Sequence, residues 1–255
     1  PYLKSEDTQV RVAAIRAIGR VQKTKLTPLV QNMMGDPSQE VRLAAAHAAG
    51  LMGSGTRNKI VDRLVVETVP KVRQALVWSL RHVAQADQVT TLLDLMADDD
   101  VIVRAQSLYG LSRLVKRAPA LGDKLDRTAL LSALQDSDPT VRFAAIDLIS
   151  RVQKFKSPQL LEALGRCLDD GQPTVRMLCV RTLGRFGPTG KALRDKAALD
   201  SDWRVGVETA RADVRAGDVS GLAERIEAFS VRLETEKVDL RTAALHPIQG
   251  VFEGA

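Results

Sequence analysis

Residues 136–152, DSDPTVRFAAIDLISRV, place an acidic turn with a proline directly before a Val-Arg pair and a run of small apolar residues. The fixed φ of proline suits the first turn of a helix, where its missing N–H removes no hydrogen bond. The valine begins an apolar stripe at helical spacing, and the alanines allow a neighbouring helix to approach closely. The stretch therefore predicts a helix that begins at the turn and packs against others of its kind.

The same phrase recurs along the chain, as GDPSQEVRLAAAHAAGLMG at 35–53 and as DDGQPTVRMLCVRTLGRFG at 169–187. Its arginines are spaced 31 residues apart at first and less regularly afterwards, at Arg11, Arg42, Arg73, Arg104, Arg142, Arg176 and Arg204. An acid precedes five of the arginines by six residues, at Asp36, Glu67, Asp98, Asp136 and Asp170. A fixed period in this range indicates stacked supersecondary units. We expect each arginine to reach an acid of its own or a neighbouring repeat, so that a ladder runs along the stack.

A second set of amphipathic segments lies between these helices, for example KIVDRLVV at 59–66 and QLLEALGRCL at 159–168. Each repeat is therefore predicted to be a helical hairpin, with the Val-Arg pair on its second helix. A single hairpin cannot bury its apolar face, so the copies are expected to stack into a superhelix.

The repeated pattern D-P-x-x-V-R-x-x-A-x-x-A-L-G resembles HEAT repeats, in particular the short HEAT-like form of phycobilisome lyases and many bacterial proteins. The resemblance covers roughly residues 5–217 and implies an all-α fold, a right-handed α-solenoid of about seven to eight hairpins. We expect a repeat array over 1–217, followed at 218–255 by a degenerate repeat or cap, or by the join to a further domain. The resemblance leaves function open, because members of the family serve as scaffolds, adaptors and occasionally enzymes.

Composition excludes several classes of protein. The 255 residues contain no run of about 18 apolar side chains, so we expect no membrane span and a cytoplasmic location. Cys167 and Cys179 form no disulfide framework or zinc motif and are expected to be buried thiols in a reducing compartment. The three histidines lack metal-binding spacing and no phosphate-binding loop is found, so we expect no cofactor and no enzyme activity. The chain opens with PYLKSEDTQ, without Met, and is expected to be a piece of a longer protein.

Two series of positions on the second helices are candidates for binding. Residues one, five and eight after each repeat arginine are expected to face away from the core, on what resembles the inner, concave surface of HEAT-like superhelices. Basic residues nine after the arginine form a second series on the flank of the helix. The predicted binding residues are Arg16, Arg20, Trp78, His82, Tyr109, Arg113, Phe143, Arg151, Met177, Arg181 and Arg185.

Each series has a structural alternative. Exposed aromatic groups often mark an interaction surface, but curvature of a superhelix also brings such side chains against the next repeat. Aligned arginines recognise carboxylate or phosphate, but arginine near a helix end also caps the last carbonyls.

These series predict a non-catalytic scaffold that binds another protein, or another domain of the same chain, and acts as a monomer. The net charge of +6 keeps nucleic acid as an alternative partner. A remote variant is an enzyme similar to the HEAT-like alkylpurine DNA glycosylases, with Asp147 placed among Trp78, Tyr109, Arg113, Arg151 and Arg181. A further alternative is the scaffold region of a larger multidomain enzyme.

Overall fold

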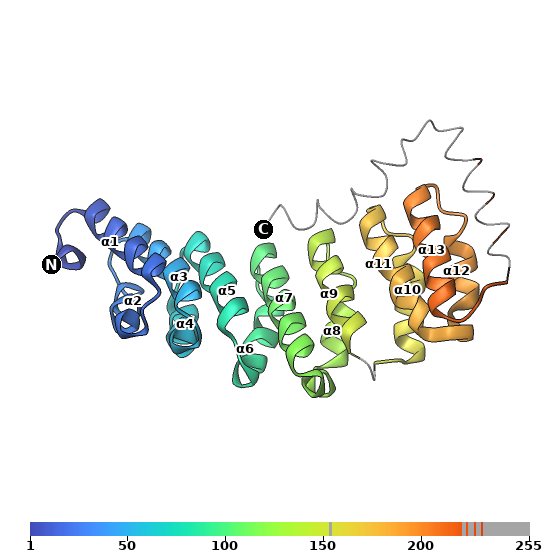
Figure 1. Ribbon diagram of the computed structural model, residues 1–255, viewed down its shortest axis with the longest axis horizontal. Helices are drawn as coiled ribbons and strands as arrows, with labels where there is room; N and C mark the ends of the chain where they lie inside the picture. Colours follow the sequence, from blue (N-terminus) through green and yellow to red (C-terminus); the bar gives the residue numbers. More distant parts are fainter. Residues whose placement is uncertain (153–154, 221–222, 224–226, 228–230, 232–255) are drawn as a thin grey trace. The chain divides into compact units, whose positions relative to one another are not determined.

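The computed structural model describes residues 1–152 and 155–220, together with residues 223, 227 and 231 (Figure 1). Within these residues the chain forms thirteen α-helices, joined by turns and short 3-10 segments, and no strand. The predicted all-α class is confirmed.

The helices alternate between two sets along the chain. The first helices of the hairpins are α2 (Thr27–Met33), α4 (Arg57–Val66), α6 (Val89–Asp94), α8 (Arg127–Ala133), α10 (Pro158–Cys167) and α12 (Lys191–Ala197). The second helices carry the repeat arginines and are α1 (Thr8–Val21), α3 (Gln39–Met52), α5 (Pro70–Val83), α7 (Val101–Arg117), α9 (Pro139–Arg151), α11 (Pro173–Leu183) and α13 (Trp203–Arg215).

The described part of the chain thus contains six hairpins, preceded by α1, which has only a short 3-10 turn before it. Most of residues 218–255, where an eighth copy or a cap was predicted, lies outside the described residues. That prediction and the handedness of the superhelix stay predictions.

The acidic turns start the second helices as the sequence predicts. Asp7 and Ser38 precede α1 and α3, and their side chains accept hydrogen bonds from the amides of Gln9 and Glu40, at 2.7 and 3.3 Å. A side chain in this position satisfies one of the amides that have no partner within the helix. In α5, proline occupies the first helical position instead.

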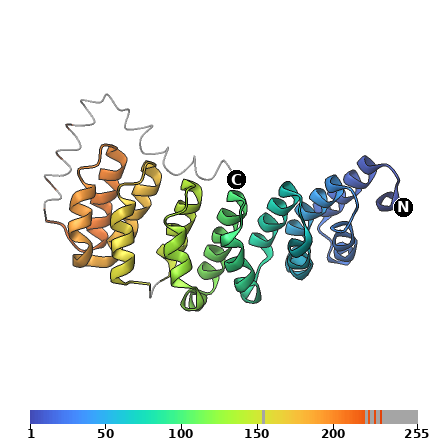
Figure 2. The same cartoon turned by 180° about the vertical axis from the view of Figure 1, so that it is seen from behind.

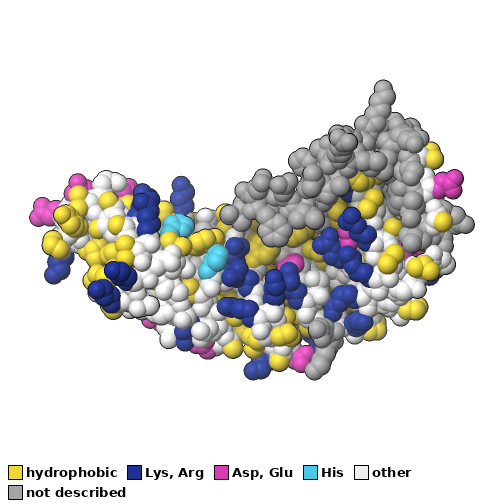
Figure 3. Space-filling view, in the orientation of Figure 1, with side chains coloured by type: hydrophobic (Ala, Val, Ile, Leu, Met, Phe, Trp, Pro, Cys, Tyr) yellow, Lys and Arg dark blue, Asp and Glu magenta, His cyan; other side chains and the backbone are white. Residues whose placement is uncertain are grey.

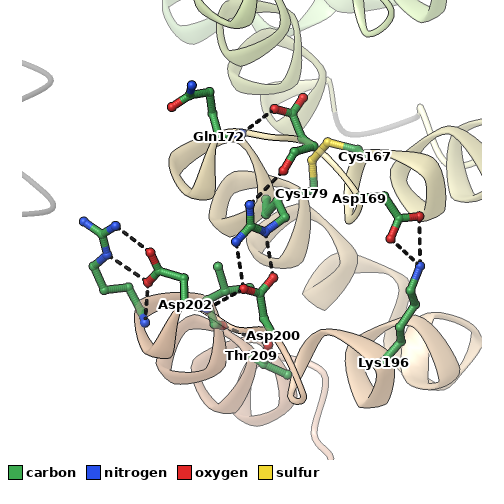
Figure 4. A network of polar contacts seen from close by, with 12 residues as sticks. Cys167, Asp169, Gln172, Cys179, Lys196, Asp200, Asp202 and Thr209 are labelled. Atoms are coloured by element: carbon green, nitrogen blue, oxygen red, sulfur yellow. Dashed lines mark hydrogen bonds and ion pairs between the residues drawn. A yellow bond between two sulfur atoms is a disulfide. The ribbon is translucent and has the colours of Figure 1, made fainter. Parts of the chain in front are cut away.

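The predicted arginine ladder is confirmed within each unit described below. The guanidinium of Arg42 donates to both carboxylate oxygens of Glu67, at 2.8 and 3.1 Å, and also to the carbonyl oxygens of Asp36 and Pro37 in its own turn. The same pairing with the next acidic turn joins Arg11 to Asp36, Arg73 to Asp98, Arg142 to Asp170 and Arg176 to Asp200. Figure 4 shows the bonds that Asp200 accepts. Each arginine therefore fixes its own turn and ties it to the turn that follows.

The chain divides into two compact units, Pro1–Ala133 with Arg151–Lys154, and Leu134–Ser150 with Phe155–Ala255. In the first unit, α1 packs on α3, α3 on α5 and α5 on α7, so the second helices lie side by side (Figure 1, Figure 2). In the second unit, α11 packs on α10 and α13.

Small residues set the distance between neighbouring second helices. A Cβ atom at Gly50 of α3 would lie 2.8 Å from Oγ of Ser79 and 3.1 Å from its Cα atom on α5. Oγ of Ser79 in turn donates a 2.6 Å hydrogen bond to the carbonyl of Ala46. The close approach predicted from the small residues is confirmed for this pair of helices.

The expectation of two free thiols is wrong, because a disulfide joins Cys167 on α10 to Cys179 on α11 (Figure 4). Their Cα atoms are 6.3 Å apart, within the range that a disulfide spans. The sequence could not show this, because only the hairpin packing brings the end of α10 beside the middle of α11. The disulfide also removes the ground on which a reducing compartment was expected.

Among the described helices, none combines the length and the hydropathy needed to cross a bilayer.

Candidate binding face of the second helices

The second helices of the first unit carry almost no negative charge. Helices α1, α5 and α7 contain no Asp or Glu, and α3 contains only Glu40, in its first turn. The other acids of these repeats lie on the first helices and in the turns, and ladder arginines pair with three of the turn acids, Asp36, Glu67 and Asp98. The solvent-facing side of these four helices, which we call the second-helix face, is therefore positively charged.

A strip of aromatic and cationic side chains crosses this face from helix to helix. We define the strip as Arg16 on α1, His47 on α3, Trp78, Arg81 and His82 on α5, and Tyr109 and Arg113 on α7. Sequence spacing predicts four members of the strip. The position five residues after a repeat arginine holds Arg16, His47, Trp78 and Tyr109.

Ring contacts connect the middle of the strip. The Trp78 ring lies 5.7 Å from the His47 ring and 4.3 Å from the His82 ring, measured between centroids. Nδ1 of His82 is 2.7 Å from the carbonyl oxygen of Trp78, which places an N–H donor on that nitrogen. The guanidinium carbon of Arg81 lies 5.7 Å from the centroid of the Tyr109 ring, in cation–π geometry. Trp78 and Tyr109 are each half-buried.

The charges of the strip repel one another. Burial lowers the pKa of His47, and the charge of Arg16 lowers it further. Burial also lowers the pKa of His82; its bond to the Trp78 carbonyl raises that pKa, while Arg81 and Arg113 lower it. Burial and the charge of Arg113 likewise lower the pKa of Arg81, whose buried Nε has no hydrogen-bond partner. Both histidines are therefore mainly neutral near pH 7, beside cations that no carboxylate of their own helices offsets.

Three of the predicted arginines are exposed in the first unit. Arg16, Arg20 and Arg113 have no ion pair among the residues that the structure describes. Figure 3 shows both described histidines on one face of the first unit, with Lys and Arg side chains on either side of them. This cationic surface is open to a ligand.

The predicted arginines of the second unit differ, because local contacts use them. Nε of Arg181 donates to Glu208 at 3.0 Å. Arg185 donates to the carbonyl oxygens of Ile149 and Ser150 at the end of α9, at 3.0 and 2.5 Å, so the capping alternative is confirmed for this residue. Arg151, which ends α9 and belongs to the first unit, is exposed.

The expectation that Met177 faces solvent is wrong, because its side chain is only 8% exposed. Val12, Ala105 and Val205, which also follow a repeat arginine, are buried as well, whereas Phe143 is half-buried. A second helix packs on its own first helix and on its neighbours, and this widens the buried arc beyond the simple helical wheel. The positions five and nine after the arginine are exposed or half-buried in every described repeat except that of α13, where both are buried.

The set proposed for a glycosylase-like enzyme is divided between the units. Asp147 belongs to the second unit, and Trp78, Tyr109 and Arg113 belong to the first. Among the described residues, no group of three or more His, Cys, Asp or Glu side chains is arranged to hold a metal ion.

Two members of the strip, His47 and Arg81, were not among the predicted binding residues. His47 lies at the same five-residue offset as Trp78, so the repeat alignment contained the signal for it. Arg81 lies eight residues after Arg73, an offset that was also expected to face away from the core, and the packing of α5 on α7 places it over Tyr109.

Comparisons with known proteins support the repeat architecture. The sequence matches the family of HEAT repeats over residues 1–80 and 127–212. The fold is similar to that of YibA from Escherichia coli, with a TM-score of 0.66 and 13% identity over 93% of this chain and 90% of that one. It is also similar to an engineered protein, with a TM-score of 0.58 and 17% identity over 90% and 69% of the two chains. A designed armadillo repeat protein matches with a TM-score of 0.52 and 15% identity over 74% and 98% of the chains. Among curated proteins, no sequence matches this chain.

Proposed function

The chain belongs to the HEAT-repeat family, and from this premise we propose that it is a non-catalytic scaffold whose second-helix face binds a partner protein or another domain of the same chain. The observation that carries the proposal is the strip in the first unit. Trp78 lies between two histidine rings, and exposed arginines without ion partners border it. Trp, Tyr and Arg are the residues most enriched where protein interfaces concentrate their binding energy.

The second unit offers less to a partner, because Arg181 and Arg185 are held by local contacts and Met177 is buried. We therefore place the binding function on the first unit. Phe143, within α9, and Arg151, at its end, are retained as candidates.

Nucleic acid is the second candidate partner. Exposed arginines beside partly open rings are also what single-stranded nucleic acid requires, because bases stack on aromatic groups and phosphates pair with cations. The two candidates differ in the molecule that contacts Trp78.

Site-specific photo-crosslinking tests the proposal. A photoreactive phenylalanine analogue replaces Trp78 in one protein and Val65 in a control, since Val65 is an 81% exposed residue on the first helix α4. After irradiation in extract of the source organism, we expect a discrete protein adduct from position 78 and none from position 65. Equal labelling at both positions would contradict a partner on the second-helix face, and an adduct sensitive to nuclease would favour the nucleic-acid candidate.

A further inference from the structure

We propose that the strip of the first unit is a site for an extended acidic polypeptide segment, whose carboxylates pair with Arg16, His47, His82 and Arg113 on successive helices. This inference rests on the proposed function and adds the chemistry of the partner. Its basis is the charge and the spacing of the side chains in the strip.

Charge complementarity selects an acidic occupant. The helices that form the face supply cations at the strip and no carboxylate beyond Glu40. Burial is the main cause of the lowered pKa values of Arg81 and His82, and repulsion between the cations lowers both further; an anion on the face would relieve that repulsion. The buried Nε of Arg81 is a donor without a partner, and an acceptor that entered beside Tyr109 would satisfy it.

The repeat geometry favours an extended chain. Packed helices lie about 8–10 Å apart, so the strip presents a cation or an imidazole at that interval. An extended polypeptide rises about 3.3 Å per residue, so every third side chain advances about 10 Å. A segment with Glu or Asp at every third position therefore places one carboxylate on each helix, while the residues between them contact the Trp78 and Tyr109 rings.

The same spacing favours a polypeptide over duplex DNA, and the test below compares a polypeptide with a single strand. Duplex DNA carries one charge per roughly 1.7 Å of axis, and its binders contact about six to ten phosphates. The strip offers only Arg16 and Arg113 as exposed arginines without ion partners, with Arg20 beside them. A few widely spaced cations fit a few widely spaced carboxylates.

Binding of this kind takes up protons. His47 faces Arg16 from α1 and the Trp78 ring from α5. His82 faces Arg81 and the Trp78 carbonyl of its own helix and Arg113 from α7. Burial and the neighbouring cations lower both pKa values in the free protein, and a bound carboxylate acts in the opposite direction and raises them. The complex then holds more protons than the free protein, so affinity rises as the pH falls from 8 to 6. Glutamate in the peptide stays ionised throughout this range.

The test measures binding of labelled peptides to the full chain by fluorescence anisotropy. The probe is an unstructured twelve-residue peptide with Glu at every third position; its control has Gln at the same positions, and a single-stranded oligonucleotide is the third ligand. The protein variants are Arg16→Gln with Arg113→Gln, His47→Gln with His82→Gln, and the control Lys59→Gln, an exposed cation on the first helix α4.

We expect the Glu peptide to bind and the Gln peptide not to bind. The paired arginine variant should weaken the affinity about tenfold, since each exposed charge pair contributes up to about fivefold. The affinity should rise roughly fivefold between pH 8 and 6, and the paired histidine variant should abolish this rise. The Lys59→Gln protein should behave as the wild type.

Equal affinity for the Gln peptide, or an unchanged affinity in the arginine variant, would overturn the inference. Tighter binding of the oligonucleotide through the same arginines would replace it with the nucleic-acid candidate. If the crosslink at position 78 still captures a protein while no acidic peptide binds, the scaffold function stands and only the acidic character of the partner is refuted.

Discussion

The carboxylate of Glu67 makes the clearest quantitative prediction about stability. Glu67 is 3% exposed and ends α4. It accepts two hydrogen bonds from Arg42, at 2.8 and 3.1 Å, two from Arg63, at 3.0 and 2.9 Å, and one from the amide of Val69, at 3.1 Å. Burial alone would raise its pKa, but these bonds outweigh burial and lower the pKa from 4.5 to about 2.

This lowered pKa converts into a contribution to folding. A difference of this size corresponds to about 3 kcal/mol of stability at pH 7, since each tenfold change in a proton affinity is about 1.4 kcal/mol. Because the pKa is lower in the folded state, the contribution is complete above pH 4.5 and is lost as the pH falls towards 2. About 1.4 kcal/mol should remain at pH 3.

The perturbation is Glu67→Gln, which keeps the shape of the side chain and one acceptor oxygen but removes the charge. We expect a loss of about 2–3 kcal/mol in the free energy of unfolding at pH 7, and about half of that at pH 3. Urea unfolding followed by far-UV circular dichroism gives the values, and hydrogen exchange in α3 and α5 locates the change. The control is Glu162→Gln, because Glu162 forms an exposed pair with Arg166 and should contribute little. An equal loss at both pH values would refute the assignment of this stability to the ionised carboxylate.

Two further predictions concern covalent and steric constraints. Urea-unfolded protein that has not been reduced should show no free thiol at Cys167 or Cys179, and reduction should lower the free energy of unfolding by about 2–3 kcal/mol; two thiols in the unreduced protein would contradict the disulfide. Gly50→Ala should destabilise the chain by about 1–3 kcal/mol, because the added Cβ meets Ser79 at 2.8 Å. Gly171→Ala is its control, since nothing lies within 4 Å of a Cβ there, and equal melting temperatures for the two variants would exclude the close contact.

The repeat pattern predicted the local fold well, and the reasons are physical. Turn acids, helix-starting residues and arginine partners all act within about one repeat of one another, so a sequence period records them directly. The position of Met177 and the disulfide were mispredicted because both depend on how a helix packs against its neighbours. The same holds for Arg185, whose capping role requires the end of α9 to lie within reach. A helical wheel considers one helix alone, whereas the burial of a residue in a stack of hairpins also depends on the helices packed against its own.

The ion pairs of the repeat also affect the charge of the second-helix face. The fold needs an acid in each turn and an arginine to neutralise it, and the ladder pairs of Arg11, Arg42 and Arg73 are each at most a quarter exposed. The periodic charges therefore cancel at the turns and contribute little to the field over the second helices. The charge that remains on the face comes from positions whose residues or partners differ between repeats. Arg16 on α1 has no ion pair among the described residues, whereas Arg181, at the same position of α11, pairs with Glu208. Partner selectivity is thus set by residues outside the ladder, and substitutions there can change binding without disturbing the stack.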